Sequence, residues 1–321
     1  MAALAHTSAR ALEFDSLREM LRAYVYSPLG QAKIAALAPS GDCDWIERQQ
    51  QLTAEIREYL RVGARFEFSG LLEPTPLVEK AHIEGAALDT AELRDIILVV
   101  DRADEWRHIA HEPPSQMKVG FAAVSELSST LADFTELLRF FRNKILPDGT
   151  LDDRASPELA RIRREIERQR RIIQESLRAY LRRLAEGGTV QDELITIRGE
   201  RFVIPVKIEQ KRRVQGVVHG ASSSGQTVFV EPMETIEQNN ELVRMLEEEQ
   251  AEIHRILLEM TARIREQAAA ILSATAVLSE LELQFAKARF ADDYDCTSPH
   301  LRGDGRPRPS GSDEVAPEMP E

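Results

Sequence analysis

The chain has 321 residues, of which 30% are charged and only 6% aromatic, and its formal net charge is −13. This length allows about two domains, and the composition is typical of long, surface-rich helices rather than of a compact β protein. The acidic total argues against a protein that coats nucleic acid over its whole surface. It leaves room for a local basic patch, because binding follows the distribution of charge as well as its sum.

Cysteine usage and hydropathy indicate a soluble cytoplasmic protein. Cys43 and Cys296 form no Cys-x-x-Cys pair, which suits a reducing compartment. The N-terminus has no continuous apolar run, so no secretory signal is expected. The longest aliphatic run, residues 96–100, is too short to cross a bilayer. No membrane partner is therefore predicted.

Residues 1–150 are predicted to form an all-helical core domain. Ser40 and Asp42 are capping signals for one helix, and Asp89 or Thr90 for another. A third amphipathic helix is expected over residues 124–146. Its apolar residues recur at spacings of three and four: Leu127, Leu131, Phe134, Leu138 and Phe141.

A heptad pattern then predicts two long helices that pair. The outgoing helix occupies residues 151–188 and ends at a glycine pair. The return helix occupies residues 233–295, and a helix from about 233 to 290 would be roughly 87 Å long if unbroken. Gln250 and Gln267, polar residues on its apolar stripe, are expected to set the register. The return helix should run antiparallel to the outgoing one and then pack on the first domain.

Residues 189–232, between these helices, predict a small antiparallel sheet. Its turn signals are Gly199-Glu200, Gly216 and Ser224-Gly225. The expected fold class is mainly α: a helical core, a long antiparallel coiled-coil lever arm and a small antiparallel β clamp at its tip. Residues 296–321, rich in proline, glycine and charge, are expected to be a disordered tail.

Cations gather at the predicted tip, where residues 198–213 hold six cations and two acids. Such a patch suits a phosphate backbone, and neighbouring serine hydroxyls can donate to phosphates. The candidate nucleic-acid-binding residues are Arg198, Arg201, Lys207, Lys211, Arg212, Arg213, Ser222, Ser223 and Ser224. A secondary basic face on the outgoing helix consists of Arg164, Arg168, Arg171, Arg178 and Arg182. Because arginines and aromatics do not alternate here, we expect contacts that do not read bases.

The alternative is that these charges are only the solvated face of an exposed arm. Other chemistry has weak support. His108, His111 and Glu112 lie at a predicted helix end and are too few for a metal site. The GASSSG stretch at 220–225 lacks the strand-turn-helix context of a nucleophile elbow. No catalytic residue is assigned.

The segment RGERFVIPVKIEQKRRVQGVVHGASSSGQTVFVEPMETIEQNNEL, residues 198–242, resembles the clamp of the MutS family, specifically its bacterial type 2 branch. ALEFDSLREMLRAYVYSPLGQAKIAAL at 11–37 and LPDGTLDDRASPELARIRREI at 146–166 also resemble this branch. The resemblance covers about residues 10–297. It implies a core, lever and clamp in a dimeric ATPase whose paired clamps close around a ligand.

The resemblance implies two roles. One is binding branched or mismatched DNA, with suppression of homologous recombination and a place in DNA repair. The other is ribosome quality control, in which the clamp binds rRNA on collided ribosomes. Phe134-Thr-Glu136 and Phe229-Val-Glu231 spell the Phe-x-Glu mismatch-probing pattern of the family. Neither lies in the front domain that presents it, so we expect neither to probe DNA.

The sequence also departs from the family pattern. It contains no Gly-Lys dipeptide and therefore no phosphate-binding loop, and no Smr nuclease domain is recognisable. ATP and Mg²⁺ are thus cofactors of the full-length family and none is expected in this chain, which should have no activity alone. We expect a truncated, frame-shifted or split gene product. Its partners would be DNA or ribosomal RNA, a doubtful homodimer, or a separate ATPase-bearing chain. A structural coiled-coil protein without a ligand is the third reading.

Overall fold

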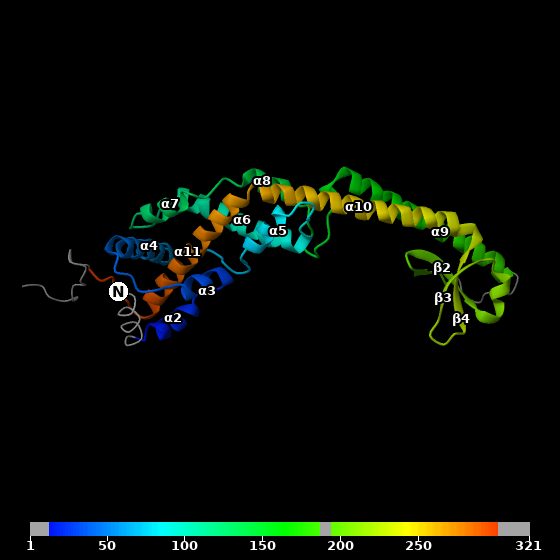
Figure 1. Ribbon diagram of the computed structural model, residues 1–321, viewed down its shortest axis with the longest axis horizontal. Helices are drawn as coiled ribbons and strands as arrows, with labels where there is room; N and C mark the ends of the chain where they lie inside the picture. Colours follow the sequence, from blue (N-terminus) through cyan, green and yellow to red (C-terminus); the bar gives the residue numbers. More distant parts are fainter. Residues whose placement is uncertain (1–12, 187–193, 301–321) are drawn as a thin grey trace, which may run out of the picture. The chain divides into compact units, whose positions relative to one another are not determined.

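The computed structural model describes residues 13–186 and 194–300 (Figure 1). The chain forms two compact units. Unit 1 combines residues 1–142 with 261–321, and unit 2 is residues 143–260. Most of the predicted disordered tail, residues 301–321, lies outside the described residues, as does the start of the predicted clamp.

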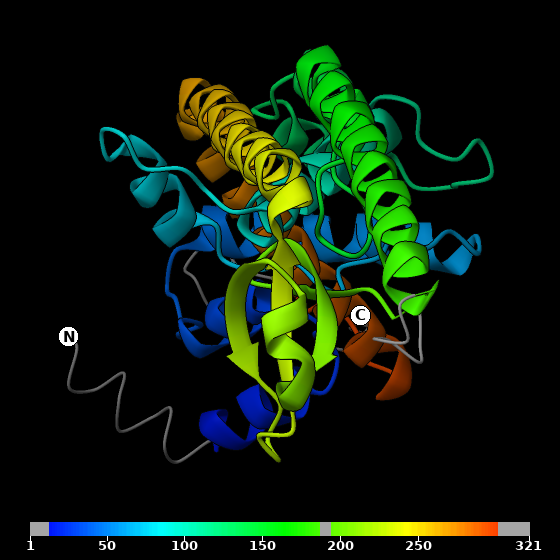
Figure 2. The same ribbon diagram turned by 90° about the vertical axis from the view of Figure 1, so that its right-hand side faces the viewer.

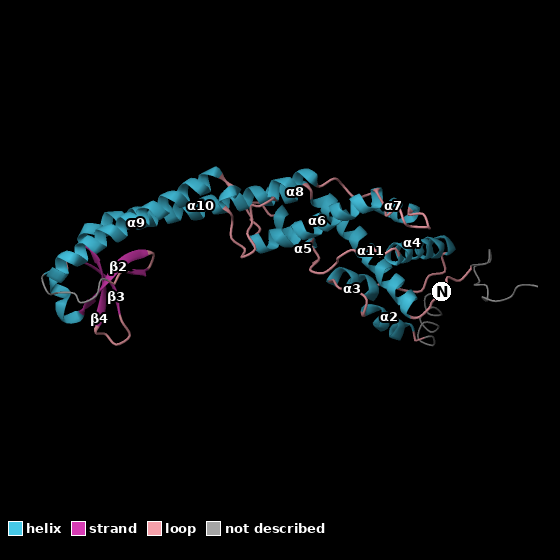
Figure 3. Ribbon diagram, turned by 180° about the vertical axis from the view of Figure 1, so that it is seen from behind, coloured by secondary structure: helices cyan, strands magenta, loops and turns pink. Residues whose placement is uncertain are grey.

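The described part of unit 1 is built from helices (Figure 3). These are α2 (Phe14–Arg22), α3 (Pro28–Ala35), α4 (Cys43–Arg61), α5 (Thr75–His82), α6 (Thr90–His111), α7 (Ala122–Ser128), α8 (Thr135–Phe141) and α11 (Ala268–Asp293). Two predicted caps are confirmed. The Asp42 side chain accepts from the backbone N–H of Trp45, and Asp89 forms a reciprocal capping box with Glu92.

The single helix expected over residues 124–146 is wrong, because α7 and α8 are separate. Hydroxyl groups in the intervening stretch bond to backbone carbonyls. Ser129 Oγ donates to Glu126 O at 2.7 Å, and Thr130 Oγ1 donates to Leu127 O at 3.4 Å. Asp133 then accepts from the N–H of Thr135, where α8 begins. Such local bonds compete with helix propagation, although the apolar spacing continues through them.

The core of unit 1 is an aromatic cluster around α11. Trp106 and Phe285 are fully buried, with ring centroids 5.6 Å apart in an edge-to-face arrangement. Helix α11 packs on α2, α3, α4 and α6. Among the described residues it is the one helix long and apolar enough to cross a membrane by length and composition. However, 61% of its most apolar window is buried within the protein, so it is the central core helix of unit 1.

The long return helix is also corrected. It consists of α10 (Ile236–Glu266) and α11, separated at Gln267, whose backbone leaves the helical region with φ −104° and ψ 9°. No proline or glycine marks this break. Gln250 and Gln267 are both exposed, so neither sets a buried register. The polar residues buried along α10 are instead Asn239, Glu252 and Thr261.

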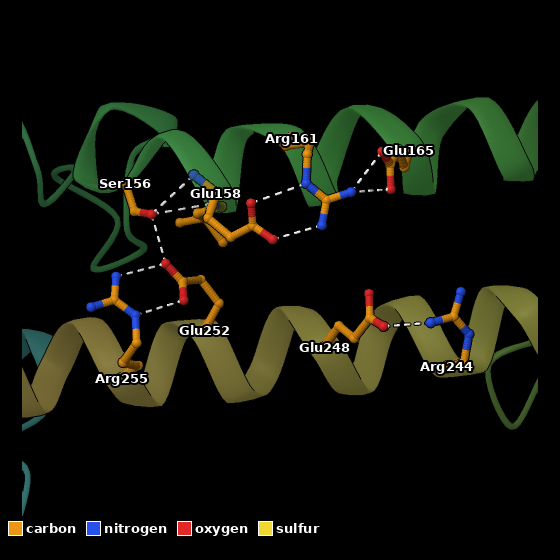
Figure 4. Close-up of polar contacts among 9 residues, drawn as sticks. Ser156, Glu158, Arg161, Glu165, Arg244, Glu248, Glu252 and Arg255 are labelled. Carbon is orange, nitrogen blue, oxygen red and sulfur yellow. Dashed lines mark hydrogen bonds and ion pairs between the residues drawn. The ribbon is translucent and has the colours of Figure 1, made fainter.

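In unit 2, α9 (Pro157–Glu186) runs antiparallel to α10. A short 3-10 turn, η1 (Asp153–Ala155), precedes α9. Three polar contacts show this direction, because residues later in the first segment contact residues earlier in the second. They join Ser156 to Glu252, Gln169 to the carbonyl of Gln238, and Arg183 to Glu234. Figure 4 shows the first of these. Ser156 Oγ donates to Glu252 Oε1 at 2.6 Å and accepts from the first-turn N–H groups of α9.

A four-stranded antiparallel sheet follows α9 (Figure 2). Its order is β1-β2-β4-β3, with β1 (Thr196–Arg198), β2 (Arg201–Lys207), β3 (Gly216–Ala221) and β4 (Thr227–Pro232). Gly199 and Glu200 both have positive φ, as the tight β1–β2 hairpin requires. The sheet confirms the expected fold class. Residues 208–213, however, form a 3-10 helix, η2 (Ile208–Arg213), and another short turn, η3 (Met233–Thr235), leads into α10.

Sheet and helices share one core in unit 2. Buried residues of α9, including Ile173, Leu177 and Leu181, pack with Phe202, Ile204, Val228 and Val230 of the sheet and with Leu242 of α10. Asn239 of α10 bonds to the β2 backbone in both directions. Its Oδ1 accepts from Phe202 N at 2.9 Å, and its Nδ2 donates to Phe202 O at 3.0 Å.

Candidate nucleic-acid interface

Four of the predicted tip cations lie on and beside η2. Lys207 ends β2, and Lys211, Arg212 and Arg213 form the last turn of η2. All four side chains are exposed, and no ion pair holds them among the described residues. The 3-10 helix is anchored at both ends. Ile208 N donates to Gln226 O at 3.0 Å, and Val214, only 5% exposed, enters the core.

Arg201 has a structural role instead. Its Nη1 lies 2.9 Å from an oxygen of Glu231, and its Nη2 donates to Asn240 Oδ1 at 2.7 Å. The Glu231 side chain is only 2% exposed and also contacts His219 Nε2 at 2.6 Å. A buried carboxylate needs such partners. Arg201 therefore neutralises an internal charge and is not free to bind phosphate.

Arg198 is exposed and forms a different contact. Its guanidinium carbon lies 4.3 Å from the centre of the Phe229 ring, so β1 and β4 share a cation–π pair. The sequence analysis missed this pair, because the two residues lie on different strands. The only available signal was their alternation within each strand, which does not show which strands meet.

The three candidate serines divide between turn and surface. Ser222 closes the β3–β4 loop: its N–H donates to Thr227 O at 2.8 Å, and its hydroxyl accepts from Thr227 N at 3.2 Å. Ser223 and Ser224 are exposed, although Ser224 Oγ lies 3.3 Å from that of Ser222. Ser223 and Ser224 are thus accessible donors, whereas Ser222 mainly shapes the loop.

The arginines of α9 fall into two groups. Arg161, Arg163, Arg170 and Arg183 each pair with at least one acid. The hydrogen bonds that Arg161 donates to Glu158 and Glu165 raise its pKa above the ordinary value (Figure 4). The second group is the secondary basic face: Arg164, Arg168, Arg171, Arg178 and Arg182. Its members are exposed and have no ion pair among the described residues.

The geometry of α9 aligns these five arginines. Their spacings of three, four and seven residues place them on one face of a helix, opposite the buried stripe that contains Ile166, Ile173 and Leu177. They extend over roughly 27 Å at 1.5 Å per residue. Glu175 is the acid within this row and is itself exposed. Unit 2 therefore carries a row of free guanidinium groups as well as the η2 cations.

The remaining motifs carry no site in the described part of the chain. His108 Nδ1 contacts its own helix at Asp104 O, 2.7 Å away, and no three His, Cys, Asp or Glu residues gather there to hold a metal. Phe134 is 1% exposed in the unit 1 core. In the second Phe-x-Glu sequence, Glu231 is buried in its ion pairs. Neither sequence presents both side chains to a ligand.

Comparison with known proteins adds the evolutionary context. No protein-family model matches the chain. It is 36% identical to the protein named Endonuclease MutS2 of Pelotomaculum thermopropionicum, over 92% of this chain and 37% of that protein. The proteins of the same name from Symbiobacterium thermophilum and Thermomicrobium roseum are each 34% identical, over 91% of this chain and 36% of theirs. The chain thus spans a little over a third of the length of these curated relatives.

A helical unit and a small antiparallel sheet carried by a helical pair, together with these similarities, mark the chain as MutS-like. Within that class it is similar to part of the MutS2 proteins, as its resemblance to the type 2 branch predicts. This relationship covers about nine tenths of its residues.

Proposed function

We propose that unit 2 grips the sugar-phosphate backbone of DNA through the η2 cations and the secondary basic face of α9. One observation carries the proposal: five arginines on a single exposed face of α9 have no acidic partner in residues 13–186 and 194–300, whereas the other arginines of that helix are paired. Lys207, Lys211, Arg212 and Arg213 extend this free positive charge onto the sheet.

Such a surface acts through counterion release. Each arginine or lysine that neutralises a phosphate frees a condensed cation, so affinity falls steeply as salt rises and depends little on sequence. Guanidinium groups are well suited to this, because they remain charged and bind phosphate with two N–H groups. Following the type 2 resemblance, we propose branched or mismatched DNA as the ligand and suppression of recombination in the cytoplasm as the role.

ATP and Mg²⁺ belong to the proposed system and not to a site in unit 2. No phosphate-binding loop occurs in the 321 residues. We therefore propose that ATP hydrolysis and nuclease action are supplied by other parts of a whole MutS2 protein, or by a separate ATPase-bearing chain. Clamp closure around DNA would then follow from pairing with a second copy.

A matched pair of double variants tests the proposal. Arg168→Gln with Arg171→Gln removes two free arginines, and Arg161→Gln with Arg170→Gln removes two paired ones, with the same change in net charge on the same helix. We expect the first double variant to make the negative slope of log K against log salt less steep by roughly 2. The second should change it by much less. The measurement is fluorescence anisotropy with a four-way DNA junction between 50 and 200 mM salt, as probe conditions.

Equal slopes for both double variants would contradict a role for the secondary basic face. Charge reversal at Lys211, Arg212 and Arg213 tests the η2 cations in the same assay. If wild-type protein with intact helices bound no nucleic acid at low salt, the structural coiled-coil reading would replace the proposal.

Ribosomal RNA is the alternative ligand, since its phosphates offer the same charge. A photoactivatable residue at Lys211, irradiated in living cells, separates the two. Genomic DNA attached to the protein supports the proposed ligand, and ribosomal RNA attached to it supports the ribosome-collision role.

A further inference from the structure

We propose that Arg198 and Phe229 form a stacking platform for an unpaired base, so that unit 2 recognises the single-stranded part of a branched DNA. This inference rests on the proposed function and adds a base-contacting site to a surface otherwise suited to phosphates. It also adds base stacking, which the sequence analysis did not predict, while the contacts remain independent of base sequence.

The platform is formed by chain segments that only folding brings together. Arg198 ends β1 and Phe229 lies in the middle of β4, with β2 between these strands in the sheet. The guanidinium carbon stands 4.3 Å from the ring centre, which is stacking distance. Phe229 is partly buried, whereas Arg198 is exposed and has no ion pair among the described residues. The Phe229 ring therefore holds the guanidinium group, and the exposure of Arg198 leaves that group accessible to a ligand.

An open guanidinium plane is a good surface for a base. Unpaired bases in protein complexes stack on aromatic rings and on arginine planes, and every base has a face that allows this. A base inside an intact duplex has no free face. The platform therefore selects single-stranded character without selecting sequence.

A cation for the adjoining phosphate lies on the same face of the sheet. The register pairs Pro205 with Phe229 and Lys207 with Thr227. Residues two apart on a strand share a face and lie about 7 Å apart. Lys207 therefore lies on the same face as Phe229, two residues beyond Pro205, the partner of Phe229 on β2. Lys207 is exposed, and the carboxylate in β4, that of Glu231, is buried, paired with Arg201 and in contact with His219.

The decisive variant is Arg198→Lys, which keeps the positive charge but removes the plane. The probes are a blunt DNA duplex, the same duplex with a single-stranded arm, and a third in which the arm is abasic. We expect wild-type protein to bind the normal arm roughly fivefold or more tightly than the abasic arm. Arg198→Lys should lose most of that preference while binding the duplex unchanged. Phe229→Leu should lose it as well.

Arg183→Lys is the matched control. Arg183 also lies over a ring, that of Tyr180, with 5.6 Å between the guanidinium carbon and the ring centre. Its guanidinium, although exposed, is already paired with Glu234, whereas that of Arg198 has no ion pair among the described residues. The same substitution there should leave the preference for the normal arm intact.

Two failures are distinguishable. If wild-type protein bound all three probes equally, or Arg198→Lys retained the arm preference, the platform would be ruled out and the backbone-binding proposal would stand. Absence of binding to every probe at low salt would overturn both.

Discussion

Asn239 is a single residue that joins the helical pair of unit 2 to its sheet. Its amide satisfies both backbone groups of Phe202 and is completely buried. Nothing in the sequence around Asn239 identifies this partner. A buried amide needs partners with the right geometry, and here they come from a strand far away in the sequence.

We expect Asn239→Ala to lower the free energy of unfolding of unit 2 by about 2–4 kcal/mol, because it leaves two buried backbone groups unpaired. Asn240→Ala is the control. Asn240 is exposed and accepts one bond from Arg201, so its loss should cost no more than about 1 kcal/mol. Urea unfolding followed by circular dichroism measures both, and similar losses would argue against the bridging role.

Lys287 shows the cost of burying a charge in unit 1. Burial lowers the pKa of Lys287 from 10.5 to about 8, opposed in part by Glu280. Its ammonium donates to Gln49 Oε1 at 2.6 Å. The unfolded chain therefore binds this proton more tightly than the folded one. The stability of unit 1 should rise between pH 8 and 10.5, and the full cost should be present at pH 7.

Lys287→Met should accordingly raise the stability of unit 1 at pH 7, by about 1–3 kcal/mol. The gain should shrink as the pH rises from 8 toward 10.5, because the folded wild-type side chain is then already neutral, and it should vanish only above 10.5, where the unfolded side chain is neutral as well. Unfolding curves at pH 7 and pH 10 provide the test. Lys33→Met is the control, because Lys33 pairs with Glu280 at 2.9 Å and its loss offers no gain. A pH-independent effect of Lys287→Met would contradict the explanation.

At the scale of elements, the N-terminus of α9 is tied to its partner helix. Ser156 caps α9 and also donates to Glu252. Glu252 accepts in addition from Arg255, which lowers its pKa below the ordinary value. The Ser156 hydroxyl thus caps the N-terminus of α9 and also fixes the register of α9 against α10 (Figure 4).

We expect Ser156→Ala to cost unit 2 about 1–2 kcal/mol and to speed hydrogen exchange of the first-turn amides of α9. Glu165→Ala removes an exposed partner of Arg161, which keeps Glu158. That change should stay within about 0.5 kcal/mol. Hydrogen exchange followed by mass spectrometry compares the two variants. Unchanged exchange in Ser156→Ala would mean that the cap is dispensable.

Elements with a local signal could be predicted from the sequence, and those set by tertiary contacts could not. Asp42 and Asp89 indicate where their helices begin, and the glycine at 199 indicates the hairpin turn. The break at Gln267 has no local signal. The break lies between α10, which buries one stripe, and α11, which packs on four other helices. The basic face of α9 was predicted by residue, but which arginines are free depends on neighbouring acids that only the fold positions.

At the scale of the molecule, each unit has its own hydrophobic core. Leu177 is completely buried in unit 2, and Trp106 in unit 1. We expect Leu177→Ala to cost unit 2 about 2–5 kcal/mol and to leave the slow amides around Trp106 protected. Native-state hydrogen exchange reports on both regions at once. Equal loss of protection in both would show that the chain unfolds as one cooperative unit.

Because unit 1 is made of two separate stretches of the chain, its folding during synthesis is delayed. Unit 2 is one continuous stretch, residues 143–260, and its core is complete once α10 leaves the ribosome. Unit 1 must wait for α11, which carries Phe285 of the aromatic cluster. At roughly 5–20 residues per second, its first seven described helices lack that central partner for roughly 6–24 s while residues 143–260 are made. During synthesis the apolar faces of the N-terminal helices are therefore exposed and available to chaperones. We expect unit 2 to fold before unit 1.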